Sequence, residues 1–335
     1  MHASKPNILL TLAVPADLVA SARAAFPQFV WIEAQKERIL EQAAQAEIIF
    51  GPPRVEHAAA AKKLKWLQSS SAGVEKIALS EVFQKGVFAL TTAAGLHDSC
   101  AEHTLALLLA LTRQVGLYAR TAAAAGAGNE TGAGMRPYAP EIWERRKGHG
   151  SPRVLHGQTL GLLGLGAIGR AVARIAKAMG MRVFGVSYHG KPVPECDETH
   201  PVAQLDELLP RMDVLVLLLP AAPETTGLLS AARIAKLPRH ALVVNAGRGS
   251  AIDEPALIAA LRDGRIAGAG LDVFAKEPLP PDSPLYGLPN VVLTPHIGGN
   301  RPDYAERAFE IFVGNLERWV RGEPLRNVVE RERGY

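Results

Sequence analysis

The sequence has few of the features that mark membrane, disulfide-stabilised or secreted proteins. Two cysteines, Cys100 and Cys196, occur in 335 residues, so we expect no disulfide framework, no metal site and a reducing, cytoplasmic setting. The longest purely apolar runs, 105–111 and 214–220, fall far short of the roughly 20 residues that a membrane-spanning helix needs. The apolar stretch near residue 8 ends at Pro15 without a signal-peptide cleavage site, so it is interpreted as a strand.

The numbers of positively and negatively charged residues are also nearly balanced. Lys and Arg total 37, Asp and Glu total 33, and the net charge is +4. The basic residues are scattered and form no nucleic-acid motif, so we expect neither a nucleic-acid nor a membrane partner. A hydrophobic content of 48% with 21% charged residues excludes a mainly disordered chain. At roughly 150 residues per domain, the length predicts about two domains.

Apolar runs alternate with helical stretches twice along the chain. Strands are predicted at 7–14, 46–51, 64–69 and 87–91, with a helix at 16–26. After a long apolar helix at 99–120 and a Gly/Ala-rich surface loop at 121–153, six strands are predicted at 159–163, 182–186, 214–219, 241–245, 268–273 and 290–294. Helices are expected between them at 168–179, 205–209, 231–237 and 254–263, and a last one at 302–321. This pattern predicts an α/β protein with doubly wound parallel sheets.

A glycine-rich turn joins the strand at 159–163 to the next helix. It is the GxGxxG segment with Gly164, Gly166 and Gly169 around Ala167 and Ile168. The first glycine allows a tight turn, the second lets a pyrophosphate approach the backbone, and the third lets helix and strand pack closely. The helix N-terminus then stabilises the bound anion. The segment therefore predicts a dinucleotide cofactor.

The end of the following strand bears on which dinucleotide is bound. An Asp or Glu there usually holds the ribose 2′-hydroxyl, but this strand ends at Ser187, with His189 and Lys191 just beyond. A carboxylate would repel a 2′-phosphate, whereas these side chains would not. We expect NADP(H) to be preferred over NAD(H), with use of both as the alternative.

Three later strands are each followed by a charged or titratable residue, and together these residues suit acid–base chemistry on an anionic substrate. Arg248 follows the strand at 241–245, Glu277 follows that at 268–273, and His296 follows that at 290–294. Because parallel strands deliver their carboxyl ends to one edge, the three side chains are expected to converge. Arg can grip a carboxylate, His can transfer a proton, and an acid beside His favours the imidazolium and fixes its orientation.

The order of these motifs resembles the D-isomer-specific 2-hydroxyacid dehydrogenases. The matching segments are GLLGLGAIGR, LLLPAAPETTGLL, VVNAGRGSAIDEPALIAAL, GAGLDVFAKEPLP and LTPHIGG, all within 158–300. Weaker similarity continues upstream in SSSAGVEKI and AEHTLALLLALTR. The resemblance implies a Rossmann cofactor domain (99–299) inserted into a flavodoxin-like substrate domain (1–98 plus 300–335), with a cleft between them and a homodimer.

The resemblance also implies a role for individual residues. Arg248 would hold the substrate carboxylate and polarise the 2-oxo group, His296 would donate the proton, and Glu277 would bind the far imidazole nitrogen. Backbone N–H groups of Ala72 and Gly73 would bind the substrate carboxylate. The implied cofactor-binding positions are Gly164, Gly166, Ala167, Ile168, Gly169, Ser187, His189, Lys191, Leu219, Pro220, Ala246, Gly247, Arg248, Asp272, His296, Gly298 and Gly299.

Ser187 stands where NAD-preferring members carry Asp, as in the NADPH-using glyoxylate and hydroxypyruvate reductases. The expected activity is therefore reduction of a small 2-oxo acid to the D-2-hydroxy acid. One alternative is a non-catalytic, dinucleotide-sensing binding protein of the same fold. Another is an oxidoreductase of the same fold that acts on formate or phosphite.

Overall fold

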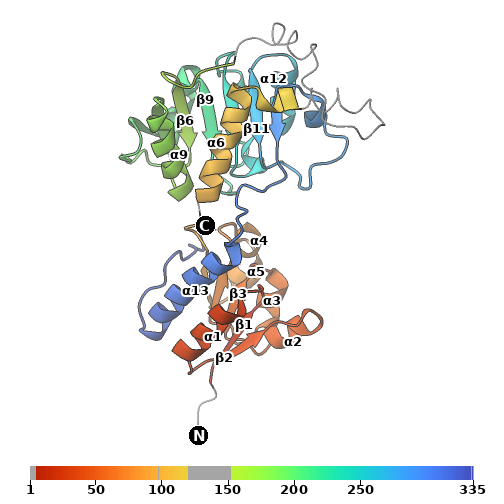
Figure 1. Cartoon of the computed structure of the whole chain (residues 1–335), viewed down its shortest axis with the longest axis vertical. Coiled ribbons are helices and arrows are strands. Elements are labelled where there is room, and N and C mark those ends of the chain that lie inside the picture. The colour runs from red at the N-terminus through yellow and green to blue at the C-terminus, as the bar shows by residue number, and fades with distance from the viewer. Residues whose placement is uncertain (1–4, 97, 120–151, 333, 335) are drawn as a thin grey trace, which may run out of the picture. The chain divides into compact units, whose positions relative to one another are not determined.

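A computed structural model describes residues 5–96, 98–119, 152–332 and 334. The chain divides into two units, the first made of residues 1–96 and 300–335 and the second of residues 97–299 (Figure 1). Assigning substrate binding to the first and cofactor binding to the second stays a prediction at this point.

The first unit contains a five-stranded, all-parallel sheet in the order β2-β1-β3-β4-β5. This is the flavodoxin-like order, in which the chain winds first to one side of β1 and then to the other. The elements are β1 (Asn7–Leu10), α1 (Ala16–Ala25), β2 (Val30–Glu33), η1 (Lys36–Arg38), α2 (Ile39–Ala43), β3 (Ile48–Gly51), α3 (Val55–Ala60), β4 (Trp66–Ser69), α4 (Glu75–Ala78), α5 (Glu81–Gln84), β5 (Ala89–Thr91) and α13 (Tyr304–Val320).

Helices cover both faces of this sheet because successive strand residues point to opposite sides. Ile48 and Phe50 pack beneath α1 and α13. Ile49, between them, packs on the other face with residues of α3, α4 and α5. The central strands β1 and β3 are therefore apolar over residues 8–10 and 48–50 rather than alternating.

The second unit contains a seven-stranded parallel sheet in the order β12-β11-β10-β9-β6-β7-β8. The strand order reverses between β6 and β9, which is the switch point where dinucleotides bind in doubly wound sheets. The elements are α6 (Asp98–Thr112), β6 (Thr159–Leu163), α9 (Ala167–Ala178), β7 (Arg182–Ser187), β8 (Glu198–Pro201), η2 (Val202–Gln204), α10 (Leu205–Leu208), η3 (Leu209–Arg211), β9 (Val214–Leu217), α11 (Ala231–Ile234), β10 (Leu242–Asn245), η4 (Gly249–Ala251), α12 (Glu254–Arg262), β11 (Gly268–Leu271), η5 (Pro284–Gly287) and β12 (Val291–Leu293).

The long apolar helix α6 packs beside α9 on one face of this second sheet (Figure 1). It approaches β11 closely, since a Cβ at Gly270 would lie 3.0 Å from Cβ of Leu107. Helices α10, α11 and α12 cover the opposite face. Helix α6 is thus fixed against the strands that carry the candidate site.

The two doubly wound parallel sheets confirm the predicted fold class, but three elements differ from expectation. The edge strands β2 and β8 were not predicted, because both are short and neither buries a continuous apolar run. The helix expected over 99–120 is interrupted: α6 ends at Thr112, Gln114 has a left-handed φ of 59°, and helical structure resumes at 115–119. The loop predicted over 121–153 lies almost wholly outside the described residues.

Among the residues that the structure describes, no helix combines the length and the apolar character needed to cross a bilayer.

Candidate active site

The glycine-rich turn lies at the switch point of the second sheet. Gly164 has a φ of 103°, and a Cβ there would lie 2.5 Å from the backbone oxygen of Leu218 after β9. A Cβ at Gly169 would lie 2.1 Å from the Gly164 oxygen. Gly166, the N-cap of α9, instead faces open space. Two glycines therefore allow close packing, while the third leaves room at the helix N-terminus that fits a pyrophosphate.

The turn after β7 lies beside this glycine loop, because the Gly164 N–H donates to the Val186 oxygen at 3.1 Å. Ser187 ends β7, and its Oγ accepts a hydrogen bond from the Gly190 N–H at 3.1 Å. Gly190 has a φ of 65°, and a Cβ there would lie 2.4 Å from the nitrogen of Pro201 at the end of β8. The shape of the turn is thus fixed by its own bonds and by β8.

Exposed polar side chains complete this turn. Tyr188, His189 and Lys191 are all exposed, and the Tyr188 and His189 rings meet edge to face at 4.8 Å. No carboxylate occupies the end of β7.

The loop after β10 contacts both the loop after β9 and the loop after β11. A Cβ at Gly247 would lie 2.6 Å from the Leu219 nitrogen, and a Cβ at Gly249 would lie 1.9 Å from the Phe274 carbonyl. Leu219 and Pro220 follow β9, whereas Ala246, Gly247 and Arg248 follow β10. These predicted cofactor positions therefore share one edge of the sheet.

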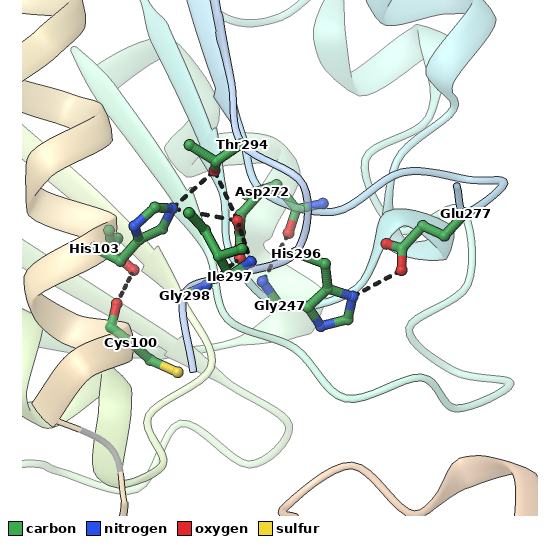
Figure 2. A network of polar contacts seen from close by, with 11 residues as sticks. Cys100, His103, Gly247, Asp272, Glu277, Thr294, His296, Ile297 and Gly298 are labelled. Atoms are coloured by element: carbon green, nitrogen blue, oxygen red, sulfur yellow. Dashed lines mark hydrogen bonds and ion pairs between the residues drawn. The ribbon is translucent and has the colours of Figure 1, made fainter. Parts of the chain in front are cut away.

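Glu277 and His296 are in direct contact. His296 Nδ1 lies 2.7 Å from Glu277 Oε2 (Figure 2). The other carboxylate oxygen of Glu277 accepts the Phe274 N–H at 3.0 Å. The side chain of His296 is 46% exposed and that of Glu277 is 35% exposed. The carboxylate fixes the imidazole through Nδ1, so Nε2 is the nitrogen that can exchange a proton with a substrate.

The backbone of His296 has a left-handed φ of 54°, a conformation that costs a non-glycine residue about 1–2 kcal/mol. Asp272, which is 2% exposed, holds it. The Asp272 carboxylate accepts the N–H groups of Ile297 and Gly298, each at 2.9 Å, and its backbone oxygen accepts that of His296 at 2.8 Å (Figure 2). Strained residues held this firmly are characteristic of functional sites.

Arg248 extends from the same edge, on the loop after β10. Asn245 closes that loop, because its side chain accepts the Gly247 N–H and donates to the Arg248 oxygen. Burial raises the pKa of the Cys100 thiol, Asp272 raises that pKa further, and the Arg248 guanidinium lowers it. The Arg248 charge thus acts on the same region of α6 as Asp272.

Ala72 and Gly73, the predicted substrate-binding positions, lie in the first unit after β4. Serine hydroxyls shape their loop: Ser69 Oγ accepts the Ser71 N–H at 3.0 Å, and Ser71 Oγ donates to the Gly73 oxygen at 2.9 Å. A third bond joins this loop to α13, since the Tyr304 hydroxyl donates to the Ser70 oxygen at 2.7 Å.

Comparison with known proteins shows the family of this chain. The family model described as "D-isomer specific 2-hydroxyacid dehydrogenase, NAD binding domain" matches residues 105–298. The chain belongs to the D-isomer-specific 2-hydroxyacid dehydrogenase family. It is 31% identical to the glyoxylate reductase of Korarchaeum cryptofilum, with 98% of this chain and 97% of that protein aligned.

Two further members of this dehydrogenase family help to define the relationship. The D-3-phosphoglycerate dehydrogenase of Methanocaldococcus jannaschii is 35% identical over 80% of this chain, but the chain spans only 48% of that protein's length. The solved NADPH-dependent glyoxylate/hydroxypyruvate reductase of Sinorhizobium meliloti, in complex with NADP and sulfate, has a TM-score of 0.77. Its sequence is 29% identical, with 99% of this chain and 100% of that chain covered.

Two polar residues of this dehydrogenase site were not singled out from the sequence. Thr294 Oγ1 donates to Asp272 Oδ1 at 2.7 Å, and His103 Nε2 lies 2.8 Å from Thr294 Oγ1 (Figure 2). The available signal was a histidine in the apolar segment AEHTLALLL and a threonine two residues before His296.

The two cysteines are both free thiols in this structure. Burial raises the pKa of the Cys196 thiol to about 11, and the neighbouring Glu195 and Asp197 add to the increase. Across the described ranges, no three His, Cys, Asp or Glu side chains are grouped to hold a metal ion.

Proposed function

We propose that this dehydrogenase reduces a small 2-oxo acid of the glyoxylate or hydroxypyruvate type to the D-2-hydroxy acid. The observation that carries the proposal is the 2.7 Å contact between His296 Nδ1 and Glu277 Oε2. It lies in the same unit as the glycine loop. An acid held in this way, on the same sheet as a dinucleotide loop, suits proton transfer coupled to reduction.

In the proposed mechanism, Arg248 binds the substrate carboxylate through its planar guanidinium and polarises the 2-oxo group. His296 gives the Nε2 proton to the carbonyl oxygen, and Glu277 stabilises the imidazolium before transfer and keeps the ring oriented. When bound, the nicotinamide cofactor would supply the hydride for C2 of the substrate. Backbone N–H groups of Ala72 and Gly73 are proposed to bind the same carboxylate.

The cofactor is proposed to bind along the carboxyl edge of the second sheet. The pyrophosphate would lie at Gly166, Ala167 and Ile168, where the α9 N-terminus is open. Further proposed contacts are Gly164, Gly169, Leu219, Pro220, Ala246, Gly247, Arg248, Asp272, His296, Gly298 and Gly299.

We further propose a preference for NADPH, which the hydrogen bonding of Ser187 supports. The Ser187 oxygen already accepts the Gly190 N–H, so its O–H is left to donate to an acceptor such as a 2′-phosphate. A carboxylate would accept from a ribose hydroxyl and repel a phosphate. The exposed His189 and Lys191 can add favourable charge.

The test follows absorbance at 340 nm with glyoxylate, hydroxypyruvate and larger 2-oxo acids, each with NADPH and NADH. We expect turnover of the smallest acids and a higher kcat/KM with NADPH. The variant S187D should move the cofactor ratio towards NADH. The control S80D adds the same charge at the N-cap of α5 in the first unit, where Asp also caps well, and should leave the ratio unchanged.

No turnover of any 2-oxo acid with either cofactor would overturn the proposed activity and favour a dinucleotide-sensing role. If the ratio of kcat/KM with NADPH to kcat/KM with NADH is the same in S187D as in the parent, only the proposed role of Ser187 in cofactor preference is overturned.

A homodimer and a cytoplasmic location are also proposed, from the resemblance and from the presence of only two cysteines. Light scattering coupled to size exclusion should give twice the 35.8 kDa chain mass, whereas a single-chain mass would contradict the dimer.

A further inference from the structure

His103 is a polar residue in an otherwise largely apolar part of α6. Its neighbours on the helix include the buried residues Ala101, Leu105 and Leu107, and its own side chain is only 18% exposed. A buried imidazole is costly unless its nitrogens find hydrogen-bond partners. Figure 2 shows the ring pointing from α6 towards Thr294 and Asp272 rather than along the helix.

The direction of the hydrogen bonds fixes which nitrogen of His103 carries a proton. A threonine hydroxyl has a single hydrogen, and that of Thr294 goes to Asp272 Oδ1 at 2.7 Å. Thr294 Oγ1 must therefore accept at its 2.8 Å contact with His103 Nε2. The same nitrogen lies 3.2 Å from Asp272 Oδ1, so one N–H faces two acceptors.

The far end of this chain of contacts is the segment that carries His296. Asp272 accepts the N–H groups of Ile297 and Gly298, which keep His296 in its left-handed conformation. A Cβ at Gly298 would lie 2.9 Å from Asp272 Oδ2 and 3.3 Å from His103 Cδ2. The His103 ring thus packs against the segment as well as bonding to its anchor.

We propose that His103 is a positioning residue for proton transfer by His296. As an Nε2–H donor it locks the Thr294 hydroxyl towards Asp272 and keeps the Asp272 carboxylate aimed at the His296 segment. Without that donor, the Thr294 hydroxyl is free to turn away and Asp272 loses two polar neighbours. His103 does not touch the substrate, and its effect reaches the reaction through Asp272 and the backbone of His296. The inference rests on the proposed reductase activity.

Three substitutions separate the donor from simple space filling. H103Q keeps an N–H donor at a reach similar to that of Nε2, H103N falls one bond short, and H103L removes the donor. Small displacements of a catalytic group can slow a reaction by about 10²-fold, so H103L and H103N should lower kcat with glyoxylate and NADPH by about 10- to 100-fold. H103Q should stay within about threefold of the parent.

The KM for glyoxylate should change by less than about threefold in each variant, because uniform binding of the substrate is not affected. H57L is a matched control, since His57 is also buried but lies on α3 in the first unit. It should retain the parent kcat. Equal losses in H103Q and H103L, or a loss expressed in KM rather than kcat, would overturn the proposal.

A second measurement does not depend on turnover. In ¹⁵N-histidine-labelled protein, His103 should show the Nε2–H tautomer, and H103L should shift the ring resonances of His296 while leaving those of His57 in place. Unchanged His296 resonances would overturn the positioning role even in an inactive enzyme. If H103L shifts the His296 resonances as expected but the parent protein reduces no 2-oxo acid, the proposed activity is overturned instead.

Discussion

Replacing Glu277 with Gln removes one charge from the candidate active site with almost no change in shape. In the parent, Glu277 Oε2 lies 2.7 Å from His296 Nδ1. A hydrogen bond between charged groups contributes about 1.5–3 kcal/mol. Because the side chains are 46% and 35% exposed, solvent screening places this pair at the lower end, about 1.5 kcal/mol. Each 1.36 kcal/mol corresponds to a tenfold change in rate, so E277Q should slow hydride transfer about tenfold.

The appropriate assay is stopped-flow absorbance at 340 nm under single-turnover conditions, because product release can mask the chemical step in kcat. E254Q is a close control. Glu254 Oε2 accepts the Ala275 N–H at 2.9 Å, while Glu277 Oε1 accepts the N–H of neighbouring Phe274. Both acids therefore support the same loop, but only Glu277 bonds to His296. Parent-like transfer in E277Q, or equal slowing in E254Q, would refute the reasoning.

Further substitutions and one labelling experiment test separate parts of the account. H296Q should lower kcat for 2-oxo-acid reduction by about 10²–10⁴-fold, and an unchanged kcat would exclude His296 as the proton donor. R248K should raise the KM for glyoxylate more than it lowers kcat, because a point charge cannot copy the guanidinium fork; an unchanged KM would contradict this. Because the Cys196 pKa is raised from 9.0 to about 11, alkylation of Cys196 at pH 8 should be about 100-fold slower in the folded protein than in urea, and equal rates would contradict that shift. G249A would place a Cβ 1.9 Å from the Phe274 carbonyl and should destabilise the protein by about 1–3 kcal/mol, seen as a lower Tm, whereas an unchanged Tm would show that the loop can yield.

The sequence predicts the central strands of both sheets because these are buried on both faces. Strand β9, for example, is buried at all four positions, and its continuous apolar run is visible in the sequence. The edge strands β2 and β8 lack that signal, since each has only one strand neighbour and β8 reads Glu-Thr-His-Pro. Their pairing is decided by the neighbouring strand rather than by their own composition.

The residues of the candidate site are likewise only partly predictable from the sequence. The sequence predicts the positions of Arg248, Glu277 and His296 because each follows a recognisable strand in a parallel sheet. The contribution of His103 is not visible, because α6 is remote in sequence from β12 and only the packed structure brings its imidazole to Thr294. Long-range hydrogen bonds of this kind leave no local pattern.

The most direct test of the central claim is a crystal structure of the protein with NADPH and oxalate, a non-reducible analogue of a 2-oxo acid. The account predicts that the Arg248 guanidinium and His296 Nε2 both lie within hydrogen-bond distance of the oxalate, with the bond between Glu277 and His296 retained. Oxalate bound away from both side chains, or His296 turned away from it, would contradict the account.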